Sequence, residues 1–526
     1  MAGMPMMRVP VPRPAVLAAG ALACATAMAA CTSGGSPGPA GPPATSPPAA
    51  AGRQDALHWH SCKVQGAPMR CASLRVPLDY RHPGGRKITL ALSEVPATAP
   101  AAQQQGDLLV NPGGPGASGR SLAAVVAQGL DHGVSAEYNI IGFDPRGVGA
   151  SVPSLHCDAS FFAGARPDYI PANQRAEQVL IGRAKSYAAD CQRRYGWLLP
   201  FMSTADAARD IDAIRAALGQ RQISYFGYSW GTYLGQVYAT LFPHRLRRMV
   251  LDSVVDPRGV WYTDNTKQDY AFEGRIRAFF SWVAAHDAVY HLGSTEAQVQ
   301  QAWSRARARL EAHPIPGPSG PMVGPDEFDD TFVAGGYSNN LWPGLASALA
   351  AYLSRNDARP LAGEYREVGT QPENLFAVYN AVQCSDVNWP RDWAKWDADT
   401  RRVYRTAPFL AWDNAWFNAA CAFWPVRGPA RPLQIRGAGL PGILMIQDTL
   451  DAATPYAGAQ VAHRLLPTAR MVVVLRGGNH AQSLSQPPNT CVNGYLNRYL
   501  ATGALPQRRG LVNAVCPPTP PPSPTG

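Results

Sequence analysis

The sequence predicts an α/β protein with a mostly parallel, doubly wound sheet that is interrupted by a helical insertion. Short β-like runs, such as residues 223–226 (ISYF), are followed by helix-like stretches before residue 256 and again after residue 430. Strands that alternate with helices are typical of parallel sheets. The stretch in between, 256–430, has helical patterns without this alternation, which predicts a cap inserted between two strands of one sheet.

The elements of the predicted sheet can be followed in order along the chain. Helical stretches are expected at 121–130, 204–217 and 231–242, and within the cap at 271–286 and 296–313. The strand-like runs are CASLRVPL (71–78), KITLALSEV (87–95), DLLV (107–110), YNIIGFD (138–144), ISYF (223–226), RRMVLDSVV (247–255), GILMIQD (442–448) and RMVVVL (470–475). The predicted boundaries are therefore a core in two parts, 53–255 and 431–516, with the cap between them.

The two ends of the chain differ from this pattern. Residues 1–31 combine arginines with a short apolar run of small residues, which indicates a secretory signal that is too short for a comfortable membrane span. The run ends in a lipobox-like cysteine, Cys31, so we expect an exported protein that is anchored to the outer face of the cell membrane by a lipid, or else is secreted. Residues 32–52 are predicted to be a disordered linker rich in Pro and Gly, and residues 517–526 a disordered Pro-rich tail.

Composition and charge narrow the class of protein. Apolar residues make up 46% and charged residues 16% of the chain, which is typical of a globular protein. The formal net charge is +10, but no dense basic run carries interleaved aromatic residues, so we expect no nucleic-acid partner.

The cysteines agree with export. Of the ten cysteines, setting aside Cys24 and Cys31 leaves eight, and an even number in an exported protein suggests disulfides. Eight cysteines allow about 100 connectivities, which the sequence does not separate. Our hypothesis pairs sequential neighbours: Cys62 with Cys71, Cys157 with Cys191, Cys384 with Cys421, and Cys491 with Cys516.

The stretch Gly227-Tyr228-Ser229-Trp230-Gly231 lies between a predicted strand and a predicted helix. A nucleophile at the end of a strand needs a sharp turn to point into a cleft, and small residues two places on either side make room for that turn. The turn also aims the start of the following helix, with the amide of Trp230, at charge that develops on a substrate oxygen. We therefore predict Ser229 as a nucleophile.

A serine nucleophile needs a base, and the base needs an acid to orient it. Downstream of Ser229, the run ending at Asp448 leads into Asp451, and a later strand leads into His480. The order serine, acid, histidine is typical of the hydrolases in which a serine occupies such a turn. We predict His480 as the general base, with Asp448 and Asp451 as the alternative acids.

The glycine-rich loop Asn111-Pro112-Gly113-Gly114-Pro115-Gly116 is placed to supply a second oxyanion amide, for which we choose Gly114. A rival interpretation exists, because residues 114–119 match GxGxxG and the next strand ends in Asp144, as in a dinucleotide site. The ordered set of serine, acid and histidine outweighs that weak motif. Asp144 is instead expected to form a structural pair with Arg146, and no cofactor is expected.

Metal sites are not predicted either. The acidic run Asp326, Glu327, Asp329 and Asp330 lacks the spacing and the glycine of an EF-hand loop, and we interpret it as a solvated loop. No cysteine pair has the CxxC spacing of a zinc site.

Several motifs together resemble a known family. NPGGPGASG, GFDPRGVGAS, GYSWGTYLG, DAATP and GGNHA are similar to those of the α/β-hydrolase prolyl and tripeptidyl aminopeptidases, above all the secreted actinobacterial tripeptidyl aminopeptidases. The resemblance spans residues 58–516 and implies the α/β-hydrolase fold. The family's acid lies in a D-x-x-T-P pattern, which selects Asp451 over Asp448. This chain departs from the family pattern at Asp448 and at Asn479, where relatives often have glycine.

The resemblance implies a serine peptidase that removes dipeptides or tripeptides from a free N-terminus, and a peptide as its partner. Such an enzyme should bind the substrate ammonium with a carboxylate in a partly dry pocket, for which the cap residues Glu273 and Asp386 are candidates. We expect a monomer. The alternatives are a carboxylesterase or lipase that uses the same triad, and a surface binding protein that has lost activity.

Overall fold

The computed structural model describes residues 57–164, 166–317 and 322–525. The predictions for the signal segment 1–31, for Cys31 and for the linker 32–52 lie outside the described residues. Within the described part, no helix has both the length and the apolar character that crossing a membrane requires.

A sheet of ten strands runs through the described part of the chain, in the spatial order β1-β2-β3-β5-β4-β6-β7-β10-β11-β12. The strands β1 to β3 and β5 are joined by antiparallel pairings, and all the pairings from β5 through β4 to β12 are parallel. The bounds are β1 His60–Val64, β2 Ala67–Pro77, β3 Lys87–Val95, β4 Gly106–Asn111, β5 Tyr138–Asp144, β6 Ile223–Tyr228, β7 Leu246–Asp252, β10 Ile443–Asp448, β11 Ala469–Val474 and β12 Ala514–Cys516. The predicted mostly parallel sheet is confirmed.

Helices cover both faces of this sheet. Successive strand residues point to opposite faces, so Leu109 of β4 packs with α4 and α5, whereas Leu108 and Val110 pack with α1 and α17. These helices are α1 Leu122–Gly129, α2 His132–Ala136, α4 Thr204–Ala217, α5 Trp230–Leu241, α16 Tyr456–Leu465 and α17 Thr490–Thr502. The core is thus a three-layer helix–sheet–helix arrangement.

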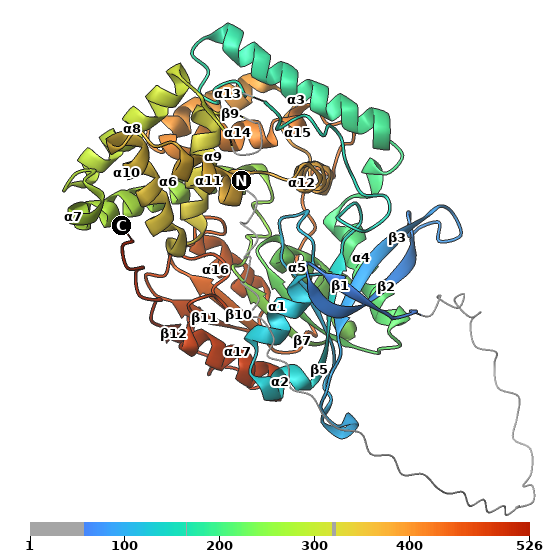
Figure 1. The fold of residues 1–526 in the computed structure, drawn as a ribbon. Helices are drawn as coiled ribbons and strands as arrows, with labels where there is room; N and C mark the ends of the chain where they lie inside the picture. The colour runs from blue at the N-terminus through green and yellow to red at the C-terminus, as the bar shows by residue number, and fades with distance from the viewer. Residues whose placement is uncertain (1–56, 165, 318–321, 526) are drawn as a thin grey trace, which may run out of the picture. The chain divides into compact units, whose positions relative to one another are not determined.

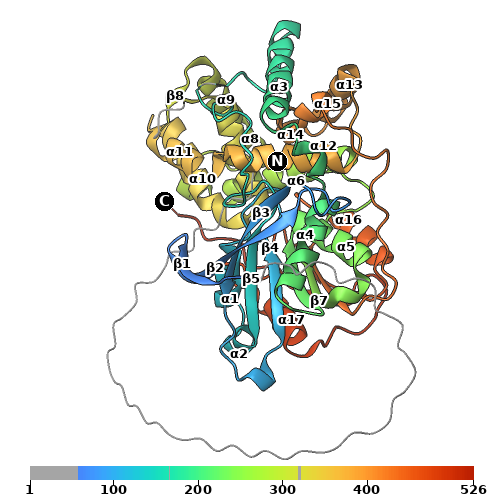
Figure 2. The same cartoon turned by 90° about the vertical axis from the view of Figure 1, so that its right-hand side faces the viewer.

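The helical cap is inserted between the adjacent parallel strands β7 and β10, and lies over one end of the sheet (Figures 1 and 2). Its helices are α6 Tyr262–Ala285, α7 Asp287–Tyr290, α8 Glu296–Ala312, α9 Pro325–Tyr337, α10 Trp342–Ser354, α11 Arg359–Glu364, α12 Glu373–Asp386, α13 Trp393–Tyr404, α14 Pro408–Asn418 and α15 Ala420–Phe423. Two short strands, β8 Ile315–Pro316 and β9 Met322–Val323, pair within it.

One long helix lies in the segment 53–255, which the sequence analysis assigned to the core, but it packs with the cap instead. Helix α3, Gln174–Tyr195, buries Leu180 and Ile181 against Trp412 and Trp416 of α14. Figure 1 shows α3 beside α13 and α15. The cap is therefore built from two separate parts of the chain, and the predicted boundary at residue 255 separates only the second of them.

The acidic run in α9 is buried, which corrects its interpretation as a solvated loop. Arg166 forms ion pairs with Glu327 (2.6 Å) and Asp330 (2.7 Å), and Arg307 forms one with Asp329 (2.9 Å). These paired charges join α9 to α8 and to the segment before α3. The expected pair of Asp144 with Arg146 is also wrong, because Arg146 binds Asp210 of α4 through two hydrogen bonds of 2.8 and 2.7 Å.

The structure forms the four disulfides of our hypothesis. Cys62–Cys71 joins β1 to β2, and Cys157–Cys191 ties the segment before α3 to that helix. Cys384–Cys421 links α12 to α15 inside the cap, and Cys491–Cys516 links α17 to β12. Each bridge closes a loop of 9 to 37 residues, and so limits the freedom of the unfolded chain.

The C-terminal tail packs across the molecule, which corrects the prediction of disorder for 517–526 as far as residue 525. Asn479 Nδ2 donates a hydrogen bond of 3.1 Å to Thr519 Oγ1. Further on, Ser347 Oγ of α10 donates to the carbonyl of Thr525 (2.7 Å), and the amide of Thr525 donates to Tyr290 Oη (3.2 Å). The tail therefore runs from the core to the cap (Figure 1).

Deleting residues 517–526 while keeping Cys516 should lower the free energy of unfolding by about 1–3 kcal/mol, because a few hydrogen bonds between core and cap are lost at about 1 kcal/mol each. Denaturant unfolding followed by tryptophan fluorescence measures this change. Ser523→Ala, which alters an exposed residue of the same tail, is the control and should leave the midpoint where it was. A deletion variant as stable as the full chain would show that the C-terminal tail does not stabilise the fold.

Candidate functional site

Four loops meet at the carboxyl ends of the parallel strands. Strands β4 and β6 lie side by side in the sheet. From β4 the chain goes to β5, which pairs with one edge of β4, and later it goes to β6 and β7, which lie on the other side of β4. Such a switch point leaves a crevice beyond the strand ends, where ligands bind in open α/β sheets. The loops after β4, β6, β10 and β11 carry Gly114, Ser229, Asp451 and His480 respectively.

Ser229 occupies the tight turn between β6 and α5. Its φ of 55° lies in the left-handed region, where a side chain is strained. The flanking glycines leave no room for larger residues: a Cβ on Gly227 would lie 2.5 Å from the carbonyl oxygen of Gly231, and one on Gly231 would lie 2.8 Å from that of Asn111. The Ser229 side chain is half-buried and lines the pocket described below.

The loop after β4 lies directly against this turn. A Cβ on Gly113 would lie 2.9 Å from Ser229 Cβ and 3.0 Å from the amide nitrogen of Trp230. The Gly113 amide already donates a hydrogen bond to Asn111 Oδ1 (2.9 Å). The next amide of the loop belongs to Gly114, which lines the same pocket as Trp230. Gly114 and Trp230 thus line the same pocket as Ser229, from the loops after β4 and β6.

Asp451 and His480 form a buried pair. His480 Nδ1 lies 2.9 Å from Asp451 Oδ2 and 3.0 Å from Oδ1. Thr454 holds the carboxylate from the other side, with its amide 3.0 Å from Oδ1 and its hydroxyl 2.8 Å from Oδ2. This contact gives a physical reason for the threonine of D-x-x-T-P. Burial alone would raise the pKa of Asp451, but the charge and hydrogen bond of His480, with the Thr454 donors, outweigh it and lower that pKa.

The other ring nitrogen, His480 Nε2, is buried and has no hydrogen-bond partner among the described residues. The backbone of His480 is fixed by the cap, because its amide donates to the carbonyl of Tyr337 at the end of α9 (2.8 Å). The Tyr337 ring also packs edge-on against the imidazole, with centroids 5.5 Å apart. The base–acid contact is therefore present, and Nε2 is left able to accept a proton.

Asp252, which sequence reasoning missed, links the serine turn to the histidine loop. Its carbonyl accepts a hydrogen bond from the Ser229 amide (3.1 Å), and its carboxylate accepts from the amide of Ser483 (2.7 Å). Burial raises the pKa of Asp252 to about 6, against hydrogen bonds from Ser483 and the charge of His480. In the sequence, Asp252 is an acid at the end of a predicted strand, and nothing distinguished it from the other residues of that strand.

Asp448, the alternative acid, does not contact the imidazole. It is buried, and its Oδ2 accepts from the amide of Asn479 (3.1 Å). Burial, together with the negative charges of Asp451 and Asp252, raises its pKa well above the usual range. The structure thus brings Asp451, and not Asp448, to His480, while Asp448 caps the histidine loop.

Asn479 joins three parts of the molecule beside His480. Its Oδ1 accepts from the amide of Asn339 in the cap (2.9 Å), and its Nδ2 donates to Thr519 in the tail. Its backbone amide binds Asp448. The side chain therefore ties the cap and the tail to the loop that carries the histidine.

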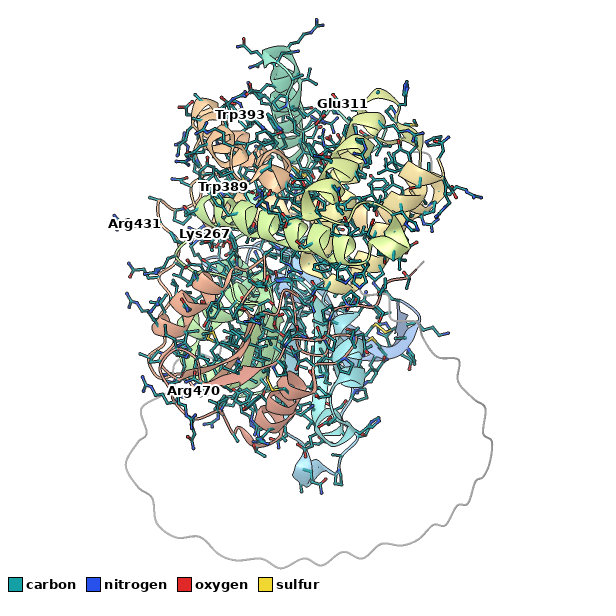
Figure 3. The ribbon with its side chains drawn as sticks, turned by 90° about the vertical axis from the view of Figure 1, so that its left-hand side faces the viewer. Lys267, Glu311, Trp389, Trp393, Arg431 and Arg470 are labelled. Carbon is teal, nitrogen blue, oxygen red and sulfur yellow. A yellow bond between two sulfur atoms is a disulfide. The ribbon has the colours of Figure 1, made fainter. Side chains whose placement is uncertain are left out.

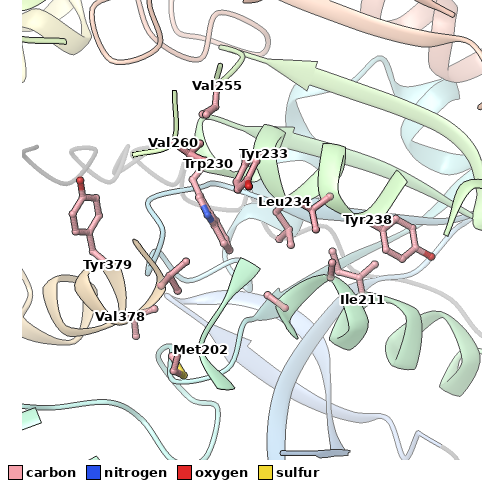
Figure 4. Close-up of a cluster of buried hydrophobic side chains, with 14 of the residues drawn as sticks. Met202, Ile211, Trp230, Tyr233, Leu234, Tyr238, Val255, Val260, Val378 and Tyr379 are labelled. Carbon is pink, nitrogen blue, oxygen red and sulfur yellow. The ribbon is translucent and has the colours of Figure 1, made fainter. Parts of the chain in front are cut away.

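A small pocket of about 50 Å³ is lined by Ser229 and its neighbours. Core and cap both contribute its lining residues: Gly114, Ser229, Trp230, Val255, Asp256, Trp261, Asp264, Asn265, Gln268, Tyr337, Leu375, Tyr379, Gln383, Ala453 and Thr454. Figure 4 shows the side chain of Trp230, at the start of α5, with Tyr233 of the same helix on one side and Tyr379 of the cap helix α12 on the other.

The two acids predicted to bind a substrate ammonium do not line this pocket. Glu273 accepts from Arg277 Nε (3.1 Å) and from the amide of Phe409 (3.2 Å), so it joins two cap helices. Asp386 is buried behind the pocket wall and accepts from the Thr204 amide (2.6 Å) and from Trp261 Nε1 (3.1 Å). Its role is therefore to support the wall, and the acids that do line the pocket are Asp256 and Asp264.

Comparison with known proteins agrees with this geometry. The model of the alpha/beta hydrolase fold family matches residues 108–486. A tripeptidyl aminopeptidase of Streptomyces coelicolor is 40% identical over 471 residues, which cover 86% of this chain and 85% of that protein. The serine protease Hip1 of Mycobacterium tuberculosis is 31% identical over 481 residues (86% and 89% covered), and a carboxylesterase B of the same species is 34% identical over 479 residues (85% and 88% covered).

Proposed function

Because this chain belongs to the tripeptidyl aminopeptidase family of α/β-hydrolases, and is a serine hydrolase of the aminopeptidase type, we propose that it is an exported enzyme that releases dipeptides or tripeptides from free N-termini. The observation that carries the proposal is the buried Asp451–His480 pair, whose neighbours Thr454 and Tyr337 line the same pocket as Ser229. Export, with a lipid on Cys31, rests on the signal pattern of residues 1–31.

In the proposed mechanism, Ser229 Oγ attacks the carbonyl carbon of the scissile peptide bond while His480 Nε2 takes its proton. The amides of Trp230 and Gly114 donate to the oxygen that becomes negative in the tetrahedral intermediate. His480 then gives the proton to the leaving amine, the C–N bond breaks and an acyl-enzyme remains. Water, deprotonated by His480, hydrolyses the ester and frees Ser229.

Asp451 acts on this sequence through His480. Its carboxylate holds the Nδ1–H tautomer, so that Nε2 is free to take the proton of Ser229, and it stabilises the imidazolium that forms in each step. No metal or organic group is required for these steps. The residues of the pocket wall, above all Trp230 and Trp261, would position the short peptide.

A substrate panel tests the proposal against its alternative. Tripeptidyl p-nitroanilide with a free amine should be hydrolysed with a higher kcat/KM than its N-acetylated form and than a short acyl p-nitrophenyl ester. The likeness to a protein named carboxylesterase B favours the esterase as the second candidate. If the ester is the best substrate and the peptides are not cleaved, the esterase replaces the peptidase.

A further inference from the structure

The pocket over Ser229 has one acidic corner, where the cap begins. Asp256 follows β7, and Asp264 lies in the first turn of α6; both line the pocket. Lys267 lies between them, with its Nζ 2.9 Å from Asp256 Oδ2 and 3.0 Å from Asp264 Oδ1. Figure 3 shows Lys267 where α6 passes above the core.

One oxygen of this corner is left without a partner. Asp264 is only 9% exposed, and its Oδ2 has no hydrogen-bond partner among the described residues. A buried carboxylate oxygen in this state carries a cost in free energy that a cationic donor would remove. The chain makes space for this carboxylate at Gly259, where a Cβ would lie 1.7 Å from Asp264 Oδ1.

The charges of the corner do not balance. When ionised, the two carboxylates carry two negative charges, and Lys267 supplies one positive charge. One further cation would neutralise the group. The amide side chains of Asn265 and Gln268, which also line the pocket on α6, add polar atoms around the same place.

We propose that Asp264, supported by Lys267 and Asp256, binds the α-ammonium group of the peptide substrate. The proposal rests on the proposed peptidase function and replaces the sequence-based candidates Glu273 and Asp386. The ammonium would donate to Asp264 Oδ2, and the acyl part of the peptide would lie between this corner and Ser229 in the same pocket. The other walls, which include Val255, Trp261 and Leu375, are apolar and would contact side chains of the substrate.

This arrangement limits how much peptide can precede the cleaved bond. An ammonium held at Asp264 and a carbonyl held at Ser229 are two fixed points inside one pocket, so the residues between them must span a set length. A longer peptide would have to displace its amine from the buried carboxylate. The corner thus selects short acyl groups with a free amine.

Asp264→Asn tests the proposal. It keeps the size of the side chain but removes the charge, so we expect kcat/KM for a free-amine tripeptidyl p-nitroanilide to fall about 100-fold, as for loss of one partner of a buried charge pair. The rate for the N-acetylated tripeptide should change less than threefold, so that the ratio between the two substrates collapses. An unchanged ratio in the variant would overturn the proposal.

Glu273→Gln is the matched control. This residue lies on the same helix, but its carboxylate binds Arg277 and the Phe409 amide instead of lining the pocket. The ratio of kcat/KM for the free-amine tripeptide to kcat/KM for the N-acetylated tripeptide should stay at the wild-type value in this variant. An N-acetylated tripeptide that contains lysine is a second control, since rapid, Asp264-dependent cleavage of it would mean that the corner binds a lysine side chain instead.

The wild-type enzyme supplies an independent test if Asp264→Asn does not fold. Burial, partly offset by Lys267 and reinforced by Asp256, raises the pKa of Asp264 to about 7; Tyr233 of α5 is the other titratable group close enough to interact with it. Because the carboxylate must be ionised to bind an ammonium, the ratio of free to acetylated kcat/KM should rise from pH 6 to pH 7.5. A flat ratio would overturn the proposal.

The failures of the two proposals can be told apart. Labelling by a fluorophosphonate reports on Ser229 without any need for a substrate amine. A wild-type enzyme that is labelled, and that cleaves free and acetylated tripeptides equally well, would refute the role of Asp264 and leave the serine peptidase intact. An enzyme that is not labelled at Ser229 and cleaves neither peptide would refute the proposed function itself.

Discussion

Ser229→Ala should lower kcat for the best peptide substrate by about 10⁶-fold, because loss of the nucleophile from a serine–histidine–aspartate set removes almost all of its rate enhancement. The substitution removes one oxygen atom at the strained turn and leaves both flanking glycines in place. Binding of a competitive peptide inhibitor should therefore stay within about threefold of wild type. Steady-state kinetics and fluorophosphonate labelling, which should disappear, measure the effect.

Ser224→Ala is a matched control for this experiment. Ser224 lies on the same strand, β6, five residues before the proposed nucleophile, and its buried hydroxyl has no hydrogen-bond partner among the described residues. Removing an unpaired buried hydroxyl is neutral or stabilising, so activity should stay at the wild-type level. A Ser229→Ala enzyme with more than about 1% of wild-type activity would place the nucleophile elsewhere.

The features that the sequence predicted well are local ones. The strand–turn–helix around Ser229 depends on a β-like run, two glycines and a helical run that are adjacent in the chain, and the structure shows that the glycines face backbone atoms at less than 3 Å from a would-be Cβ. The positions of the strands along the chain also follow from local runs of residues. Since parallel strands end at one edge of the sheet, the loops after them had to meet there.

The features that the sequence could not predict depend on how distant segments pack. Asp264 has the pattern of an ordinary acid in the first turn of a helix, and only the placement of α6 over the core brings it into the pocket that Ser229 also lines. The proline-rich tail has the composition of a disordered segment, but Asn479, Ser347 and Tyr290 supply hydrogen bonds that composition does not reveal. Helix α3 likewise has an apolar face whose partner, α14, lies more than 200 residues away.

The placement of Glu273 and Asp386 outside the pocket could not be predicted for a related reason. A carboxylate in a cap is a reasonable ligand for an ammonium, but neither residue type nor spacing tells which carboxylates are already used. Asp386 binds Thr204 and Trp261, and through Thr204 it also supports Trp230, whose Nε1 donates to Thr204 Oγ1 (3.1 Å). Burial raises the pKa of Asp386 to about 7. Both oxygens of the Asp386 carboxyl group already accept hydrogen bonds, so neither is left for a substrate.

Asp451→Asn should lower kcat by about 10⁴-fold with little change in KM. The amide nitrogen of an asparagine would face His480 Nδ1 as a second donor, or else the side chain would turn and lose the hydrogen bonds from Thr454. Both arrangements remove the negative charge that stabilises the imidazolium, and the first also favours the tautomer with the proton on Nε2. Single-turnover kinetics with a p-nitroanilide substrate separate this loss in the acylation step from any change in binding.

Asp448→Asn is the informative counterpart, because the two acids lie three residues apart, with Asp448 at the end of β10 and Asp451 in the loop that follows. Burial and the charges of Asp451 and Asp252 raise the pKa of Asp448 well above its usual range, which favours the neutral form that an asparagine imitates. The asparagine oxygen can still accept the amide of Asn479, as Asp448 Oδ2 does. Activity should stay within about tenfold of wild type, and equal losses in the two variants, or the larger loss at Asp448, would reverse the assignment of the acid. The contrast follows from one difference: Asp451, whose pKa is lowered, contacts the imidazole, while Asp448, whose pKa is raised, contacts only the backbone of the histidine loop.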